Sequence, residues 1–426
     1  MRVLNTSAGQ DLAGIGYRYM VAAQRASIEY RTAHRTQTYL NYPYDILWGS
    51  DEEQLVKDLY RAADVMHLNN SFDPYVKLHG PAAMKPAIIE QHGTQFRGYP
   101  SAPIREAVSR HILQGVSTID LQRSAPDLLH WLPSPYDLPS LAKTGADNRR
   151  ESDGLIRIAH APTARGIKST DQLIQAVAEL KAEGLPLYLD VIEGTSWAEC
   201  LKRKAKADIF FDQVRLGYGC NAIEAWGMGI PVIAGADEWT IDRMWRTFDR
   251  AMPFYTATVG TIKESVRYLA QSADARAQWG AVGLHHAEKY HAEEPALAYA
   301  LDLYEQAIKE MAGVVRRRTI SVTGAEQGDR GRGVFRSPKY IGLMIVHRDS
   351  KFKFEAGKLA TDDPYAQELI REFIGIHPEF GVEEDLAAAP DTADTLVGKG
   401  HGGPRTSADK ISTDAAGGTL LAGGTP

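Results

Sequence analysis

The sequence contains very little cysteine. Its 426 residues include only Cys200 and Cys220, and neither belongs to a CxxC pair. A disulfide scaffold and a zinc knuckle both need more cysteines at closer spacing. Neither class of small, stapled fold is therefore expected.

Long apolar runs are also missing. No stretch approaches the eighteen apolar residues of a membrane-spanning helix, and the start, MRVLNTSAGQDLAG, is too polar for a signal peptide. A cytoplasmic, soluble protein without a transmembrane segment is the default expectation.

An excess of positive charge is absent as well. Lysine and arginine number 48 against 54 acidic residues, which gives a formal net charge of −6. This balance argues against bulk nucleic-acid binding. The 44% of apolar residues and 24% of charged residues are typical of globular proteins, and the length suggests two or three domains.

The segment from Asp208 to Ala234 contains the most informative pattern. Residues 209–211 form an apolar run that predicts a buried parallel strand, and a glycine-rich turn at 217–219 follows it. Residues 221–228 predict a helix, and residues 231–234 a second strand. Glycines between a buried strand and a helix allow backbone amides to approach an anion closely, although many such glycines serve only steric needs.

Glu224 lies about one turn into this predicted helix, where a carboxylate could reach a sugar hydroxyl beside the anion. The segment therefore predicts a phosphate bound next to a polyol, as in a nucleotide.

The same alternation of short apolar strands, glycine loops and helices occurs along much of the chain. At the N-terminus, Gly14 and Gly16 separate a strand from a helix in the same way. Such alternation predicts an α/β fold with two doubly wound parallel sheets, each covered by helices on both faces.

We predict five regions from the changes in composition. They are a first Rossmann-like domain (1–150), a second whose last helix packs back on the first (151–312), a flexible linker (313–337), a small α+β module (338–385) and a disordered tail (386–426).

Residues 1–312 resemble the GT-B glycosyltransferases, particularly the retaining, nucleotide-sugar-dependent group similar to glycosyltransferase family 4. The resemblance is carried by four segments in order, namely the glycines at 14 and 16, His92-Gly93, Arg165 with Lys168, and the Glu-Ala…Gly-Ile-Pro-Val pattern of residues 217–232. Asp212-Gln213 before the Gly-Tyr-Gly turn is similar to a phage or bacterial branch of that family.

The resemblance implies specific site residues. Arg165 and Lys168 occupy the positions of the two cations that hold the donor diphosphate, and His92 that of a histidine near the transferred sugar. The implied donor-binding residues are Gly14, Gly16, Arg165, Lys168, Gly217, Tyr218, Gly219, Asn221 and Glu224, with Glu224 accepting hydrogen bonds from the ribose. Ordinary structural roles are the alternative for each: loop cations on the surface, a glutamate favoured by the helix dipole, and a histidine that only supports a strand end.

The resemblance further implies a hexosyltransferase that uses a UDP- or GDP-sugar as substrate, with no permanently bound cofactor and no required metal. The acceptor, a glycan, a protein or a phage component, is left open. Leu216 replaces the first of two glutamates that the family carries eight residues apart, so the donor sugar is open too. An epimerase or hydrolase of nucleotide sugars, and a binding or structural protein on a decayed transferase fold, are the alternative functions.

Overall fold

The computed structural model describes residues 1–79 and 85–323, and five short strands beyond residue 332. Side chains are described up to residue 312. The chain divides into two compact units, one containing residues 1–328 and 346–351 and the other the remainder. Both predicted α/β domains lie in the first unit.

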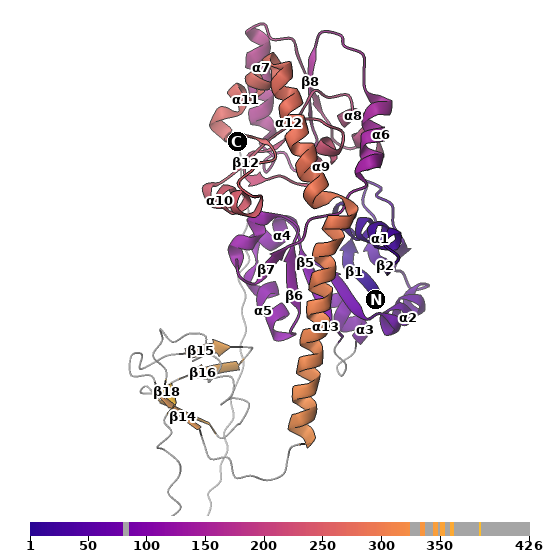
Figure 1. Ribbon diagram of the computed structural model, residues 1–426, viewed down its shortest axis with the longest axis vertical. Coiled ribbons are helices and arrows are strands. Elements are labelled where there is room, and N and C mark those ends of the chain that lie inside the picture. The colour runs from indigo at the N-terminus through magenta and orange to yellow at the C-terminus, as the bar shows by residue number, and fades with distance from the viewer. Residues whose placement is uncertain are drawn as a thin grey trace, which may run out of the picture. The chain divides into compact units, whose positions relative to one another are not determined.

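Seven parallel strands form the first sheet (Figure 1). In spatial order they are β3 (Ile46–Leu47), β2 (Glu29–Thr36), β1 (Arg2–Gln10), β4 (Val65–Asn69), β5 (Ala87–Gln91), β6 (Leu113–Val116) and β7 (Leu129–Trp131). The direction of winding reverses between β1 and β4. The loops that follow these two strands therefore diverge at a topological switch point, where open α/β sheets bind their ligands.

Helices cover both faces of this sheet. They are α1 (Ile15–Arg25), α2 (Glu53–Ala62), α3 (Asp73–His79), α4 (Gly93–Gly98) and α5 (Ser101–Ser109), with 3₁₀ turns η1 (Leu12–Gly14) and η2 (Ile119–Ser124). Successive strand residues point to opposite faces. Val65 and Ile88 accordingly pack with Tyr19 of α1, whereas their neighbours Met66 and Ile89 pack in the core on the other face.

The second sheet contains five parallel strands and one short antiparallel strand. The parallel strands are, in spatial order, β9 (Leu187–Val191), β8 (Ile156–His160), β10 (Ile209–Gln213), β12 (Val232–Ala236) and β13 (Tyr255–Thr256). This is the flavodoxin-like order, and its switch point lies between β8 and β10. β11 (Leu216–Gly217) pairs antiparallel with β12, so part of the predicted glycine turn is a strand.

The helices associated with this sheet are α6 (Leu138–Asn148), α7 (Thr170–Ala182), α8 (Trp197–Lys204), α9 (Cys220–Gly227), α10 (Glu238–Thr247), α11 (Ile262–Gln271) and α12 (Ala273–His286), with the 3₁₀ turn η3 (Val259–Thr261). Apolar residues at helical spacing on α7, including Leu173, Val177 and Leu180, pack against Ile209 and Phe211 of β10. The two sheets and their helices confirm the predicted α/β class with two Rossmann-like domains.

The chain crosses between the two sheets twice, and the two crossings touch. Residues 132–137 lead from the first sheet to the second, and the π-helical turn η4 (Ala287–His291) leads back. The amide of Tyr136 donates to the carbonyl of His291 at 2.7 Å. Beyond this point α13 (Glu293–Thr323) runs alongside the first sheet, where Leu303 and Tyr304 share a core with Tyr19 (Figure 1).

The C-terminal region differs from the prediction where it is described. Helix α13 continues to Thr323, although we predicted a flexible linker from residue 313; arginine and valine in this stretch are compatible with a helix. Strand β14 (Gly333–Arg336) also begins within that predicted linker, and it pairs antiparallel with β17 (Lys358–Thr361) and β18 (Glu383–Glu384). Strands β15 (Met344–His347) and β16 (Ser350–Lys353) pair separately. The predicted tail, residues 386–426, lies outside the described residues.

Candidate functional site

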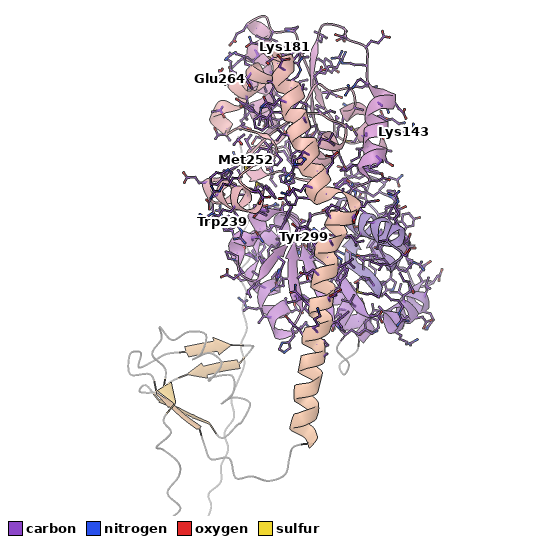
Figure 2. The ribbon with its side chains drawn as sticks, in the orientation of Figure 1. Lys143, Lys181, Trp239, Met252, Glu264 and Tyr299 are labelled. Carbon is purple, nitrogen blue, oxygen red and sulfur yellow. The ribbon has the colours of Figure 1, made fainter. Side chains whose placement is uncertain are left out.

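The two switch points are joined at the carboxyl ends of their sheets. Arg18 of α1 lies 3.3 Å from the carboxylate of Glu224 on α9, and the amide of Trp197 donates to the carbonyl of Leu40 at 2.7 Å. The guanidinium of Arg123, after β6, pairs with Asp237, which precedes α10, and lies 5.0 Å from the ring centroid of Trp239. Trp239 itself is labelled at α10 in Figure 2. The loops in which open sheets bind ligands thus converge from both domains.

Lys168 lies at the switch point of the second sheet, next to the start of α9. Its ammonium is 2.6 Å from Oδ1 of Asp212, and Oδ2 of the same carboxylate accepts the amide N–H of Gly219 at 2.8 Å. Gly219 is the N-cap of α9, so a lysine, a backbone donor and the positive end of a helix meet at one point. We call Lys168, Asp212 and Gly219 the Lys168 cluster.

Arg165 lies in the same loop but turns elsewhere. Its guanidinium forms a bidentate pair with Glu193, at the end of β9, with separations of 2.9 and 2.5 Å. Hydrogen bonding to Glu193 raises the pKa of Arg165 and, reciprocally, lowers the pKa of Glu193. Both side chains are exposed, and exposed ion pairs contribute little to stability. The contact is therefore easily exchanged for another anion.

Glu224 is buried in a cluster of its own, not open to a ligand. One carboxylate oxygen accepts the indole N–H of Trp197 at 2.8 Å and lies 3.3 Å from Arg18, and the other pairs with the fully buried ammonium of Lys204. Lys204 also donates to Asn221, whose amide donates to the carbonyl of Ala161 at 2.9 Å. In this conformation Glu224 and Asn221 hold the two domains and α8 together.

Gly217 and Tyr218 have steric and packing roles. Gly217 has φ +84°, and a Cβ there would lie 2.2 Å from Cε of Met244. The Tyr218 side chain is buried, with its hydroxyl 3.0 Å from Nε2 of His286 and 2.9 Å from Nε2 of His291. The ring of Tyr218 thus lies inside the crossing between the domains, and only its backbone belongs to the loop before α9.

In the loop around Gly14 and Gly16, a carboxylate of the protein itself binds the backbone amides. The two carboxylate oxygens of Asp11 accept the amides of Gly16 and Tyr17, each at 2.8 Å, at the start of α1. A Cβ on Gly16 would lie 2.9 Å from Oδ1 of Asn5, so only glycine allows this approach. Burial raises the pKa of Asp11, although both amide hydrogen bonds lower it. The N-terminus of α1 is thereby satisfied from within the protein.

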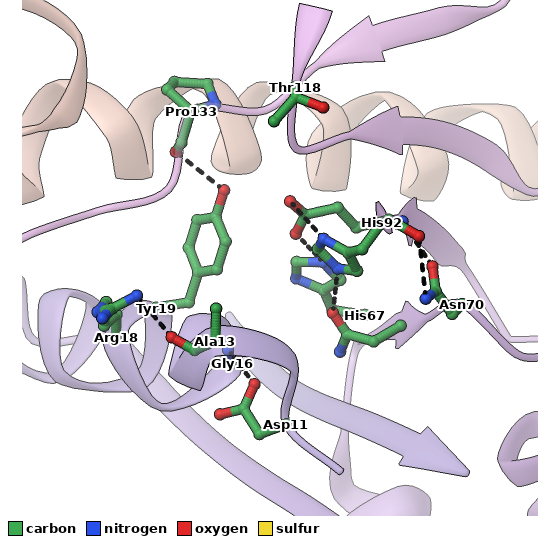
Figure 3. Close-up of polar contacts among 12 residues, drawn as sticks. Asp11, Ala13, Gly16, Arg18, Tyr19, His67, Asn70, His92, Thr118 and Pro133 are labelled. Carbon is green, nitrogen blue, oxygen red and sulfur yellow. Dashed lines mark hydrogen bonds and ion pairs between the residues drawn. The ribbon is translucent and has the colours of Figure 1, made fainter. Parts of the chain in front are cut away.

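His92 follows β5 and is almost completely buried. Its Nε2 lies 3.0 Å from Oδ1 of Asn69, and its backbone amide donates to Asn70 at 2.5 Å (Figure 3). Its Nδ1 has no hydrogen-bond partner among the described residues and faces Glu90 at 3.9 Å. Burial lowers the pKa of His92, while the nearby carboxyl of Glu90 opposes this shift.

The structure thus brings Lys168 together with the Gly219 loop, whereas Arg165 and Glu224 pair with other residues and His92 lies among Asn69, Asn70 and Glu90 at the strand ends of the first sheet. Sequence reasoning missed four side chains that fix this arrangement: Arg18, Glu90, Trp197 and Lys204. Glu90 could have been noticed as an acid inside an otherwise apolar strand, AIIEQ. The others gave no local signal because their partners are distant in the sequence.

The described part of the chain contains no cluster of His, Cys, Asp and Glu suited to a metal ion, and none of its helices is long and apolar enough to cross a membrane. A cavity of about 350 Å³ lies at the amino ends of β8, β10 and β12, and another of about 270 Å³ lies against β8, β9 and the end of α8. Neither is lined by a predicted site residue.

No family model and no curated protein matches the chain. Solved structures do match it. HepE of Anabaena in complex with UDP and glucose is 11% identical over 73% of this chain and 99% of that one, with a TM-score of 0.46. Sucrose-phosphate synthase of Thermosynechococcus elongatus is 13% identical over 73% and 100%, with a TM-score of 0.49.

WaaG, a glycosyltransferase involved in lipopolysaccharide biosynthesis, is 13% identical over 73% of this chain and 100% of that one, with a TM-score of 0.42. Similarity at such low sequence identity concerns the fold and does not indicate the activity. The phage association stays a prediction.

Proposed function

We propose that the chain is a glycosyltransferase that moves a hexosyl group from a UDP- or GDP-sugar to an acceptor with retention of configuration. The observation that carries the proposal is the Lys168 cluster at the switch point of the second sheet. Its ammonium and the positive N-terminal end of α9 supply positive charge for a diphosphate, while Asp212 holds the ammonium and accepts the Gly219 amide.

The charges around this point decide how a diphosphate would bind. Asp212 is buried, so Lys168 stays beside it, and removing one member of such a pair leaves an expensive unpaired charge. An ammonium has three donors, and two are left for phosphate oxygens. Arg165 is exposed and exchanges Glu193 for phosphate at little cost.

The proposed chemistry needs no carboxylate pair. The bond from the anomeric carbon to the diphosphate oxygen breaks, the acceptor oxygen bonds to that carbon from the same face, and the acceptor proton moves to the departing phosphate. Lys168, Arg165 and the start of α9 stabilise the charge that develops on the leaving group. These contacts do not identify the acceptor.

Hydrolysis or epimerisation of the same donor is the second candidate. The buried Glu90 and His92 at the end of β5 favour it, because such reactions need acid and base groups of the protein. The third reading is a protein that binds without turnover, and the complete internal pairing of Glu224 favours this one.

Incubation of the full-length protein with a panel of UDP- and GDP-sugars separates these readings. Release of nucleoside diphosphate, with an α-linked product by NMR from an α-linked donor, supports a retaining transferase. An isomerised sugar nucleotide without release supports the epimerase, and a free sugar with no gain from any acceptor supports the hydrolase. Failure of every donor to turn over contradicts all enzymatic readings.

A further inference from the structure

A continuous chain of buried polar groups runs from α13 to the carboxyl end of β5. The hydroxyl of Tyr304 lies 2.7 Å from Nδ1 of His67, and Nε2 of His67 lies 3.1 Å from Oε2 of Glu90. The other oxygen of Glu90 faces His92, which precedes α4. Figure 3 shows His67 and His92 among the polar contacts of this region.

The hydrogen bonds of Asn69 fix which ring nitrogen of His92 carries a proton. The amide nitrogen of Asn69 donates to Oδ1 of Asn5 at 2.7 Å and approaches the carbonyl of Thr6 at 3.3 Å. Its oxygen must therefore accept from Nε2 of His92. In a neutral ring Nδ1 is then a lone-pair acceptor.

The hydroxyl groups around His67 indicate which of its ring nitrogens faces Glu90 with a hydrogen. Burial lowers the pKa of His67 to about 3, so its ring is neutral. Two hydroxyls surround Nδ1 of His67, that of Tyr304 at 2.7 Å and that of Tyr30 at 3.1 Å, so we assign Nδ1 as the acceptor of a hydroxyl hydrogen. On this assignment Nε2 carries the ring hydrogen and donates to Oε2 of Glu90. No described donor reaches Oε1 of Glu90.

Two acceptors therefore face each other without a donor between them. Oε1 of Glu90 and Nδ1 of His92 are both buried, both without a partner among the described residues, and 3.9 Å apart. Leaving two such groups unsatisfied is costly, and one added proton satisfies both after a small rotation of the glutamate.

We propose that Glu90 and His92 share one buried proton between Oε1 and Nδ1, and that Glu90 is the positioning residue that sets the charge of His92 at the carboxyl end of β5. With the proton on Oε1 the pair is neutral and uncharged. With the proton on Nδ1 it is a carboxylate and an imidazolium, whose positive end lies at the edge of the sheet.

The surroundings place the loss of this proton near neutral pH. Burial raises the pKa of Glu90 to about 7; the adjacent His92 lowers it and the charge of Asp11 raises it. The other titratable groups facing the pair are His67 on β4, Tyr30 on β2, Tyr19 on α1 and Tyr304 on α13. Burial raises the pKa of each of these tyrosines, so all three stay neutral.

The consequence for ligand binding rests on the proposed function. A nucleoside diphosphate bound between the sheets favours the imidazolium form of His92. Above the titration of the free pair, at pH 8, binding should therefore take up as much as one proton. Below it, at pH 6, the proton is already present and little uptake is expected.

An infrared pH titration of the ligand-free protein tests the shared proton directly. The absorption of a protonated buried carboxyl should disappear with a midpoint near 7 in the wild type. It should be missing in Glu90→Gln and unchanged in Glu106→Gln, which alters an exposed glutamate on α5. Absence of a carboxyl titrating between pH 5 and 9 in the wild type overturns the proposal. Should Glu90→Gln not fold, His92→Asn, which removes the proton partner, must move the midpoint of the same absorption.

Calorimetry with UDP at pH 8, in two buffers of different ionisation enthalpy, tests the effect on the site. Proton uptake in the wild type and its loss in Glu90→Gln support the proposal. Binding without uptake overturns the link between the pair and the site. Failure of UDP and GDP to bind contradicts the proposed function, whereas the infrared result still decides whether the proton is shared.

Discussion

The guanidinium of Arg18 lies 3.3 Å from the carboxylate of Glu224, and this contact joins the first helix of one domain to the helix that follows the switch point of the other. The guanidinium also lies 4.1 Å from the ring centroid of Tyr136 in the crossing segment. Because Lys204 shares the same glutamate, one carboxylate neutralises two cations that have little contact with water. Glu224 is thus the residue whose loss should most weaken the attachment of the two domains.

Glu224→Gln should therefore destabilise the protein by about 3–5 kcal/mol, since two buried cations lose their anion. Chemical denaturation followed by tryptophan fluorescence measures this free energy. Glu106→Gln, an exposed glutamate on α5, is the matched control and should change it little. A fully stable Glu224→Gln that only binds nucleotide more weakly would instead support the ribose role implied by the family resemblance.

Arg165→Ala should slow release of nucleoside diphosphate by a factor on the order of a hundred, because one stabilising charge leaves the site. Its melting temperature should equal that of the wild type, since the side chain is exposed. Arg246→Ala is the control, because Arg246 is also an exposed arginine paired with an acid, Asp242, but lies on α10. Equal rates in both variants would remove Arg165 from the site.

Lys168→Ala should lower both activity and stability, which distinguishes it from Arg165→Ala. Asp212 keeps a buried charge without its partner, at a cost of about 3–5 kcal/mol. Adding Asp212→Asn removes that charge and should restore most of the unfolding free energy without restoring turnover. A double variant with full activity would contradict the assignment of Lys168.

Tyr218→Phe should destabilise the protein by about 1–3 kcal/mol, because two buried histidines lose the hydroxyl that both contact. Nucleotide affinity, measured by calorimetry, should be unchanged, since the side chain points into the crossing between domains. Weaker binding without loss of stability would show that the tyrosine reaches the ligand in another conformation.

The free energy of unfolding should fall as the pH is lowered from 6.5 toward 4. Burial lowers the pKa of His160 to about 4, so the folded protein holds this ring neutral while the unfolded chain protonates it. The stabilising contribution is complete above 6.5 and is lost through 4, by about 3 kcal/mol for a shift of this size.

The raised pKa of Glu90 acts in the opposite sense. The contribution of Glu90 to stability is complete below about pH 4.5 and is lost as the pH rises through 7.

Denaturation at a series of pH values tests the role of His160. The unfolding free energy should fall less steeply between pH 6.5 and 4 for His160→Gln than for the wild type. An unchanged slope would show that other groups control the loss of stability at low pH.

Local patterns were sufficient for the strands with apolar runs. The apolar run 209–211 lies in strand β10 (Ile209–Gln213), the helix predicted at 221–228 corresponds to α9 (Cys220–Gly227), and the strand predicted at 231–234 lies in β12 (Val232–Ala236), because their apolar patterns match those of buried strands and helices. Strand β2 was missed. Its sequence, EYRTAHRT, has no apolar run, yet Thr32 and His34 are buried because neighbouring strands cover them.

The sequence alone determined the class of fold and located the two loops that the Lys168 cluster joins, because alternating periodicities and glycines are local properties of the chain. It did not determine the partners. Asp212 beside Lys168, Glu193 beside Arg165, and Arg18 and Lys204 on Glu224 are contacts between residues from 20 to more than 200 positions apart. Only the tertiary structure brings such charges together, and their mutual neutralisation decides which predicted residues are free to meet a ligand.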